Sequence, residues 1–429
     1  MSGGEMGSAG GNGANARAVR ECLGLLVAAA STSASAEPLQ QTLISVSRNL
    51  DVPTWEVTSR EATPDCPIPW SVRKMTLHGG KQEGVEVIVV DNGKLRFAVC
   101  PTRGMGLLRG EIGDVRLGWD SPVKETVHPK FVNLLSRGGL GWLEGFNEWM
   151  VRCGMEYAGH PGTDKFINNV GDEATMDLTL HGRLGNLPAQ EVAVLIDRAA
   201  PWRIRVCGRV DERMFYGPKL ELATEISTEP GSAALRIADL VTNRGDQAQE
   251  FEMIYHTNFG RPLLEEGAAF LSAVERVTPF NARAAEGLAA YAQYGGPQPG
   301  FIEQVYCLRL LADKDGRTVA VLANKARDRA FSMTYAVKEL PCFTLWKNTL
   351  SEKEGYVTGL EPGTNFPANR RVERQYGRVR KLAPGASQPF TFDYAVHIGP
   401  AEVKAEADRV AAIQAGRTPT IDEQPEKKD

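Results

Sequence analysis

Apolar and polar residues alternate with a period of two from about Val85 almost to Ile398. This period is typical of β-strands, because successive side chains of a strand point to opposite faces of a sheet. Residues 85–90 and 95–99 flank the turn 91–93, DNG, and residues 221–228 and 234–242 flank the turn 229–232, EPGS. The pattern therefore predicts an all-β protein. Since no Pro- or Ser-rich linker interrupts the tract, we expect one large antiparallel β-sandwich with few short helices.

Composition and motifs narrow the possible functions. The chain has 429 residues, of which 42% are hydrophobic, so it can bury a large core. Its formal net charge is −4 and its basic residues are scattered, so we do not expect a nucleic-acid partner. There is no G-x-G-x-x-G motif, no P-loop and no alternating βαβ pattern, which disfavours a nucleotide-binding α/β fold. No apolar run approaches the roughly 20 residues of a membrane span.

The two ends of the chain differ from the strand-rich part. Residues 1–36 contain Arg17 and Arg20, a short apolar run at 22–30 and an A-x-A-like site at 34–36, which resemble a signal peptide. Export to the periplasm or the medium is therefore expected. The alternative is a disordered leader on a cytoplasmic protein. We expect the sandwich to span residues 37–400, and residues 401–429 to form a helix over 402–413 and a frayed polar tail over 418–429.

Three residues are the first candidates for acid–base chemistry. Residues 359–367, GLEPGTNFP, predict a turn that holds Glu361, a candidate catalytic base. His181 lies in LHGR and His256 in YHTNFG, both at the end of a predicted strand. Strand phase sets each histidine opposite its apolar neighbours, on the polar face away from the core. The simpler interpretation is that both are ordinary surface histidines.

Five segments, in order along the chain, resemble the aldose 1-epimerases, also called galactose mutarotases. Residues 255–260, YHTNFG, resemble the Y-H-x-Y-[WF]-N element of that family, and residues 180–182, LHG, resemble its L-H-G-G element. Residues 361–367, EPGTNFP, are similar to the segment around its general base. Residues 382–385, LAPG, with the following strand, and residues 113–121, GDVRLGWDS, are also similar to family segments. Residues 138–154 depart from the usual pattern and resemble a divergent bacterial branch labelled aldose 1-epimerase-like.

The resemblance implies a galactose mutarotase-like super-sandwich that binds a small-molecule carbohydrate on a concave sheet face. It implies that Glu361 is the base, that His256 is the acid toward the ring oxygen and that His181 is a second donor. A negative Glu361 would favour a protonated His256. Neither a cofactor nor a metal is expected, because the histidines are dispersed and no H-E-x-x-H motif occurs.

Several polar residues could bind the sugar hydroxyls. The candidates are Arg103, Arg183, Asn258, Arg152 and Glu148. Glu148 could instead pair with Arg152, and each arginine could equally be a solvated strand residue. Trp142 and Trp149 could stack on a pyranose, although core packing is the more common role of large aromatics in a β-sandwich.

Two other classes of function remain open. A non-catalytic carbohydrate-binding sandwich would share the fold, but it would not require a glutamate together with two histidines. A lyase or isomerase acting on an oxidised or uronic sugar could use the same glutamate and histidines on a carbon-bound proton, with arginines holding the carboxylate. The sequence does not indicate an oligomeric state or the identity of the sugar.

Overall fold

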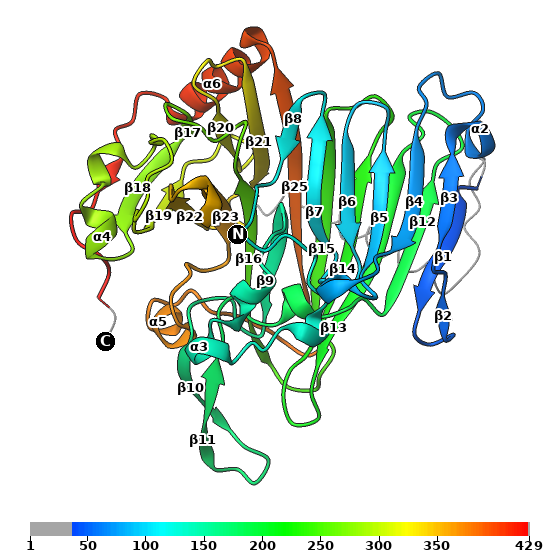
Figure 1. Cartoon of the computed structure of the whole chain (residues 1–429). Helices are drawn as coiled ribbons and strands as arrows, with labels where there is room; N and C mark the ends of the chain where they lie inside the picture. The colour runs from blue at the N-terminus through cyan, green and yellow to red at the C-terminus, as the bar shows by residue number, and fades with distance from the viewer. Residues whose placement is uncertain (1–36, 428–429) are drawn as a thin grey trace, which may run out of the picture.

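The computed structural model describes residues 37–427, and the predicted signal segment lies outside them. Two large sheets pack face to face (Figure 1). The smaller sheet runs in the order β17 (Ala269–Ser272), β20 (Arg317–Ala323), β21 (Arg329–Ala336), β25 (Ser387–Ile398), β15 (Ala234–Asn243), β14 (Lys219–Thr228), β13 (Ile204–Arg213), β12 (Glu191–Ile196), β1 (Leu39–Ser45) and β2 (Leu50–Asp51).

The larger sheet contains the central strands of the candidate site. Its order is β26 (Thr420–Ile421), β18 (Val274–Pro279), β19 (Gln304–Leu310), β22 (Cys342–Asn348), β23 (Val357–Gly363), β16 (Gln249–Phe259), β9 (Met150–Met155), β7 (Gly106–Ile112), β6 (Arg96–Cys100), β5 (Glu86–Asp91), β4 (Ser71–Thr76) and β3 (Trp55–Thr58). Strand β24 (Arg380–Leu382) pairs with β16, and β8 (Val115–Leu117) pairs with β7. Strands β10 (Gly162–Ile167) and β11 (Glu173–Leu178) form a separate hairpin that extends downward in Figure 1.

The all-β sandwich predicted from the alternation is confirmed. Both predicted hairpins form, as the antiparallel pairs β5–β6 and β14–β15. The apolar side chains of the two sheets meet in one core, to which the larger sheet contributes Ile88 and Phe97 and the smaller sheet contributes Val194 and Ile237. These side chains are almost fully buried, so the strand period has sorted the core residues onto the facing sides.

Helices are short and peripheral. They are α2 (Ser59–Ala62), α3 (Ser136–Gly139), α4 (Ala282–Ala285), α5 (Arg370–Gln375) and α6 (Pro400–Gln414), with 3-10 turns η1 (Gly80–Gln82), η2 (Pro129–Phe131), η3 (Gly141–Glu144), η4 (Leu184–Asn186), η5 (Leu288–Ala290) and η6 (Glu352–Glu354). Helix α6 matches the predicted helix, and its buried Val403 and Ile413 pack on Val319 and Val321 of β20. Among the described residues no helix is long and apolar enough to cross a membrane.

The C-terminal tail differs from its prediction as a frayed segment. Residues Thr420–Ile421 form β26, which adds to β18 as a parallel strand. Further along, the Glu426 carboxylate pairs with the Arg378 guanidinium at 2.8 Å. Composition alone indicated disorder, but backbone pairing at a sheet edge and this ion pair hold the segment in place.

Candidate active site

Glu361 and His256 meet on two adjacent strands in the middle of the larger sheet. Thr257 of β16 pairs with Leu360 of β23, and Ile254 pairs with Gly363, so the same register sets His256 opposite Glu361. His256 Nε2 lies 3.1 Å from Glu361 Oε1, and the two side chains are 5% and 2% exposed. The prediction that Glu361 sits in a turn was wrong, because residues 357–363 continue as strand β23 through Pro362.

Two residues that the sequence analysis did not single out border the carboxylate. Thr344 of β22 is the cross-strand neighbour of Glu361 in the sheet. Its buried hydroxyl has no hydrogen-bond partner among the described residues. Gly359 lies two residues before Glu361 and therefore on the same face of β23. A Cβ at Gly359 would lie 2.3 Å from Glu361 Oε1, so glycine leaves the space that the carboxylate occupies. A strand interpretation of residues 357–363 would have identified Gly359, whereas Thr344 follows only from the strand order.

His181 approaches the pair from a turn, whereas the sequence predicted a strand through this residue. Strand β11 ends at Leu178, and His181 has a left-handed backbone with φ of +60°, which is uncommon for a residue with a side chain. The following Gly182 has φ of +71°, and a Cβ there would lie 2.1 Å from the Tyr157 carbonyl oxygen. The turn brings the His181 ring to 5.2 Å from the His256 ring, measured between centroids.

Aromatic side chains enclose the two histidines. The ring centroid of Trp142 lies 4.6 Å from that of His181 and 5.9 Å from that of His256. The rings of Phe146 and Trp346 lie 5.3 and 5.4 Å from His256. The histidines do face away from the core between the sheets, as strand phase predicts for His256, but aromatic side chains enclose this side, so it is not a polar surface. Trp149, by contrast, packs in the main core as expected.

Hydrogen bonds determine which nitrogen of each histidine carries the proton. The Asn258 amide nitrogen donates to the main-chain oxygens of Glu148 and His256, at 3.0 and 3.2 Å. Its oxygen therefore faces His256 Nδ1, at 2.6 Å, and accepts a hydrogen bond from it. His181 Nδ1 likewise donates to the Ala158 carbonyl, at 3.1 Å. In the neutral form both rings thus leave Nε2 without a proton, and Nε2 of His256 faces Glu361.

Burial sets the charge of this cluster. Burial lowers the pKa of His256 to about 3 and lowers the pKa of His181 well below its usual value, with His256 as a second cause. Burial also raises the pKa of Glu361 well above 4.5. The 3.1 Å contact would suit an ion pair, but loss of solvent favours the neutral forms. The expected protonated His256 is therefore not the favoured state of the free site. Glu361 Oε1 makes no hydrogen bond to a described residue, so this oxygen is left for a bound molecule.

Arg103 and Glu148 are buried together behind this cluster. Arg103 Nε donates to Glu148 Oε1 at 2.6 Å, and both side chains are fully buried. Arg103 also donates to the main-chain oxygen of Val127, at 2.9 Å. The ion pair fixes Glu148, whose main-chain oxygen accepts a hydrogen bond from Asn258. It thereby helps to hold Asn258, which orients His256. The alternative pairing of Glu148 with Arg152 does not form.

The other two predicted arginines are engaged elsewhere. Arg152 lies between the sheets, where Nε and Nη2 donate to the two carboxylate oxygens of Asp239 at 2.6 and 3.0 Å. It alternates along β9 with Val151, which packs with Trp142 and Phe146, so Arg152 points to the opposite side of the sheet. Arg183 is 34% exposed, and its guanidinium lies 3.2 Å from the Glu156 carboxylate and 3.4 Å from that of Glu212. Of the predicted sugar-binding residues, only Asn258 touches the catalytic candidates, and protein groups occupy its amide.

The described residues contain no group of three or more His, Cys, Asp or Glu side chains arranged to hold a metal ion. A carboxyl group beside an imidazole can perform proton transfer. His256 Nε2 and Glu361 Oε1 lie 3.1 Å apart, enclosed by aromatic rings.

Comparison with known proteins agrees with this architecture. Residues 82–396 match a domain of unknown function, DUF4432. A crystal structure of a putative aldose 1-epimerase from Klebsiella pneumoniae shares 41% identity over 91% of this chain and all of its own, with a TM-score of 0.86. A galactose mutarotase-like protein from Clostridium acetobutylicum shares the fold at 14% identity and a TM-score of 0.52, over 76% of this chain and 98% of its own. No curated protein matches the chain. The chain thus belongs to the DUF4432 family and has the galactose mutarotase-like fold.

Proposed function

We propose that this protein is an aldose 1-epimerase-like isomerase that interconverts the anomers of a sugar by opening and closing its ring. The observation that carries the proposal is the 3.1 Å contact between His256 Nε2 and Glu361 Oε1, enclosed by aromatic rings. The name of the Klebsiella pneumoniae relative supports the same reaction class.

Ring opening needs one proton removed from the anomeric hydroxyl and one added to the ring oxygen. The Glu361–His256 pair can do both without changing its total charge. In the neutral form, the Glu361 carboxyl donates to the ring oxygen while His256 Nε2 accepts the hydroxyl proton. In the ionised form, with the proton on His256, the roles exchange and Glu361 is the base, as the family resemblance implies. Positioned acid and base groups each contribute about 10²- to 10⁴-fold.

His181 and Thr344 complete the proposed sugar contacts. His181 presents an Nε2 without a proton, so in this state it accepts a hydrogen bond from a sugar hydroxyl. Its expected role as a second donor requires that it first gain a proton. The unpaired hydroxyl of Thr344, opposite Glu361, can bind another sugar oxygen. A bound sugar would satisfy this buried group, which otherwise lacks a partner.

The two alternative classes receive less support. A lyase or isomerase of uronic sugars would need arginines to hold the carboxylate, but the guanidinium groups of Arg103, Arg152 and Arg183 are paired with carboxylates of the protein. A purely binding sandwich would not need a carboxyl group buried in contact with an imidazole. Burial of both groups costs stability, so a binding role alone would not explain them.

The test is the exchange rate between anomers, measured by saturation-transfer NMR or polarimetry on a panel of aldoses and uronic acids. We expect the wild type to accelerate exchange of at least one sugar, and Glu361→Gln to reduce the acceleration about 100-fold or more. The matched control is Glu354→Gln, which changes an exposed glutamate on η6 just before β23. Equal activity of Glu361→Gln and the control would refute the role of Glu361. No acceleration of any sugar by the wild type would refute the proposed reaction.

A further inference from the structure

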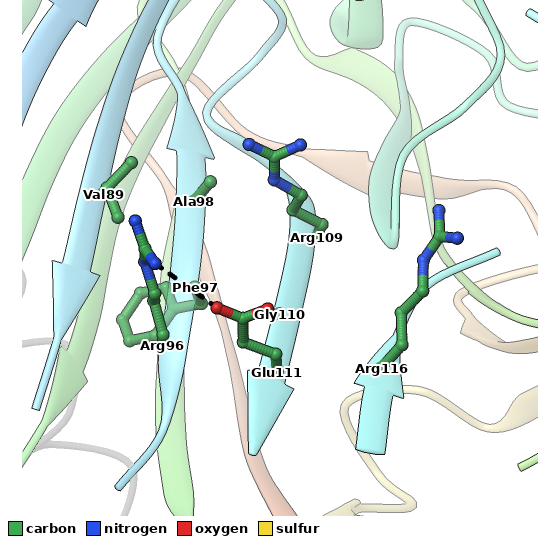
Figure 2. A pocket seen from close by; sticks show the side chains of 8 residues that line it. All are labelled: Val89, Arg96, Phe97, Ala98, Arg109, Gly110, Glu111 and Arg116. Carbon is green, nitrogen blue, oxygen red and sulfur yellow. Dashed lines mark hydrogen bonds and ion pairs between the residues drawn. The ribbon is translucent and has the colours of Figure 1, made fainter. Parts of the chain in front are cut away.

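A hollow lies on the outer face of the larger sheet, the face that also carries His256, over strands β5 to β8. Its volume is about 470 Å³, and its lining residues are Val89, Arg96, Phe97, Ala98, Arg109, Gly110, Glu111 and Arg116 (Figure 2). This volume is within the usual range for small-molecule sites. The three arginines come from three adjacent strands, β6, β7 and β8.

The three arginines differ in the hydrogen bonds and ion pairs that they make within the protein. Arg96 lies opposite Glu111, with Nη1 at 3.5 Å from its carboxylate, and Arg116 donates to the Trp119 carbonyl at 2.6 Å. Among the described residues, Arg109 has no hydrogen bond or ion pair. The hollow thus contains three guanidinium groups and one carboxylate, which leaves an excess of positive charge. Guanidinium groups bind carboxylate and sulfate oxygens through paired hydrogen bonds.

The base of the hollow is apolar. Val89 and Ala98 are opposite each other on β5 and β6, and Ala98 is opposite Arg109 on β7. Ala98 belongs to an apolar cluster on the outer face of the sheet, against which Val89 packs. A base of small aliphatic side chains under a cationic rim matches a molecule that has C–H surfaces and an anionic substituent. An acidic sugar residue has both.

The hollow continues toward the candidate active site. An adjoining cavity of about 300 Å³ is lined by the same three arginines and extends past Lys124 to Asn147 and Trp119. The ring centroid of Trp119 lies 4.9 Å from that of Phe146, and Phe146 in turn contacts His256. The groove formed by the two cavities, here called the arginine groove, therefore ends at the aromatic residues that enclose His256.

We propose that the arginine groove binds the carboxylate or sulfate ester of an acidic saccharide, with Arg109 as the main contact. The saccharide part of this assignment rests on the proposed function, while the anionic part rests on the groove itself. An extended nucleic acid is disfavoured, because Glu111 and Asp120 also line the groove and the chain is net negative.

The experiment is titration calorimetry of the full-length protein with trigalacturonate as the carboxylate probe and a sulfated chondroitin disaccharide as the sulfate probe. Maltotriose is the neutral control, and inorganic phosphate is the control for unspecific anion binding. Arg73→Gln is the matched control variant, because Arg73 is exposed in the same row of the sheet, opposite Val89, but lines neither cavity.

We expect at least one acidic probe to bind the wild type more tightly than maltotriose and phosphate. Its Kd should rise about tenfold or more in Arg109→Gln and stay within about twofold in Arg73→Gln. It should fall in Glu111→Gln, which removes the competing carboxylate. The probe that binds identifies the anion. Absence of binding by both acidic probes, equal losses in the two arginine variants, or equal binding of phosphate would overturn the proposal.

Binding should persist in Glu361→Gln, because that residue lies outside the groove. Loss of anomer exchange with retained probe binding would therefore leave this inference intact. Retained exchange with no probe binding would refute this inference and leave the proposed reaction unaffected.

Discussion

Gly359→Ala is a direct test of how closely catalysis depends on the position of Glu361. The new Cβ would lie 2.3 Å from Glu361 Oε1 and 3.1 Å from His256 Cε1, whereas ordinary contact begins at 3.4 Å. The carboxyl group must therefore move by about 1 Å, and a displacement of that size can lower a rate about 100-fold. This corresponds to about 2.7 kcal/mol in the activation free energy. Gly359 does not have a positive φ, so alanine brings no backbone strain.

The assay is catalysed anomer exchange after subtraction of the spontaneous rate, with thermal unfolding as a check of folding. Gly295→Ala is the control, since a Cβ there would meet no atom within 4 Å and its φ is also ordinary. In a Glu361→Gln background, Gly359→Ala should cause little further loss, because both changes act on one group. An activity of Gly359→Ala within about twofold of the wild type would refute the reasoning, provided that Gly295→Ala is also active.

Three further predictions concern the charge of His256, the Asn258 contact and the buried Arg152–Asp239 ion pair. Because the pKa of His256 is lowered to about 3, kcat/KM should not fall as the pH decreases through 6.5. A pH profile with an acid midpoint near 6.5 would contradict a neutral, buried His256. Asn258→Ala should lower kcat about tenfold or more, because the His256 tautomer is no longer held. Asn258→Asp should move the acid midpoint upward, because a carboxylate at Nδ1 favours the imidazolium, and an unchanged midpoint would count against this contact. Arg152→Met should lower the free energy of unfolding by about 3–5 kcal/mol, because Asp239 then stays buried without its cation. The exposed-pair control Arg236→Met should lose less than about 1 kcal/mol in urea unfolding, and equal losses would contradict the difference in burial.

The strands were predictable where a local pattern decides them. The pairs β5–β6 and β14–β15 each combine an alternating tract with a Gly-containing turn, so both hairpins follow from neighbouring residues. Glu361 was misplaced because Gly, Pro and Asn nearby favour turns in isolation. In the sheet, β22 and β16 on either side of β23 override this preference through their backbone pairing.

Partners that depend on strand order could not be predicted in the same way. The meeting of Glu361 with His256 was suggested by the family resemblance, but the opposition of Thr344 and Glu361 depends on which strands become neighbours. Arg103 and Glu148 are 45 residues apart in the chain, and no local signal predicts their pairing. The neutral state of His256 could not be predicted from the sequence either, because the enclosing aromatic rings come from distant segments.

The catalytic candidates and their enclosure have different origins in the fold. Glu361 and His256 are held by hydrogen-bonded strands, whereas Trp142 and Phe146 come from the connection between β8 and β9. Sequence changes in that connection can therefore alter the surroundings of Glu361 and His256, while the strands keep the two side chains in contact. Exchanging this connection between family members would therefore test whether it, and not the strands, sets the selectivity of the proposed isomerase.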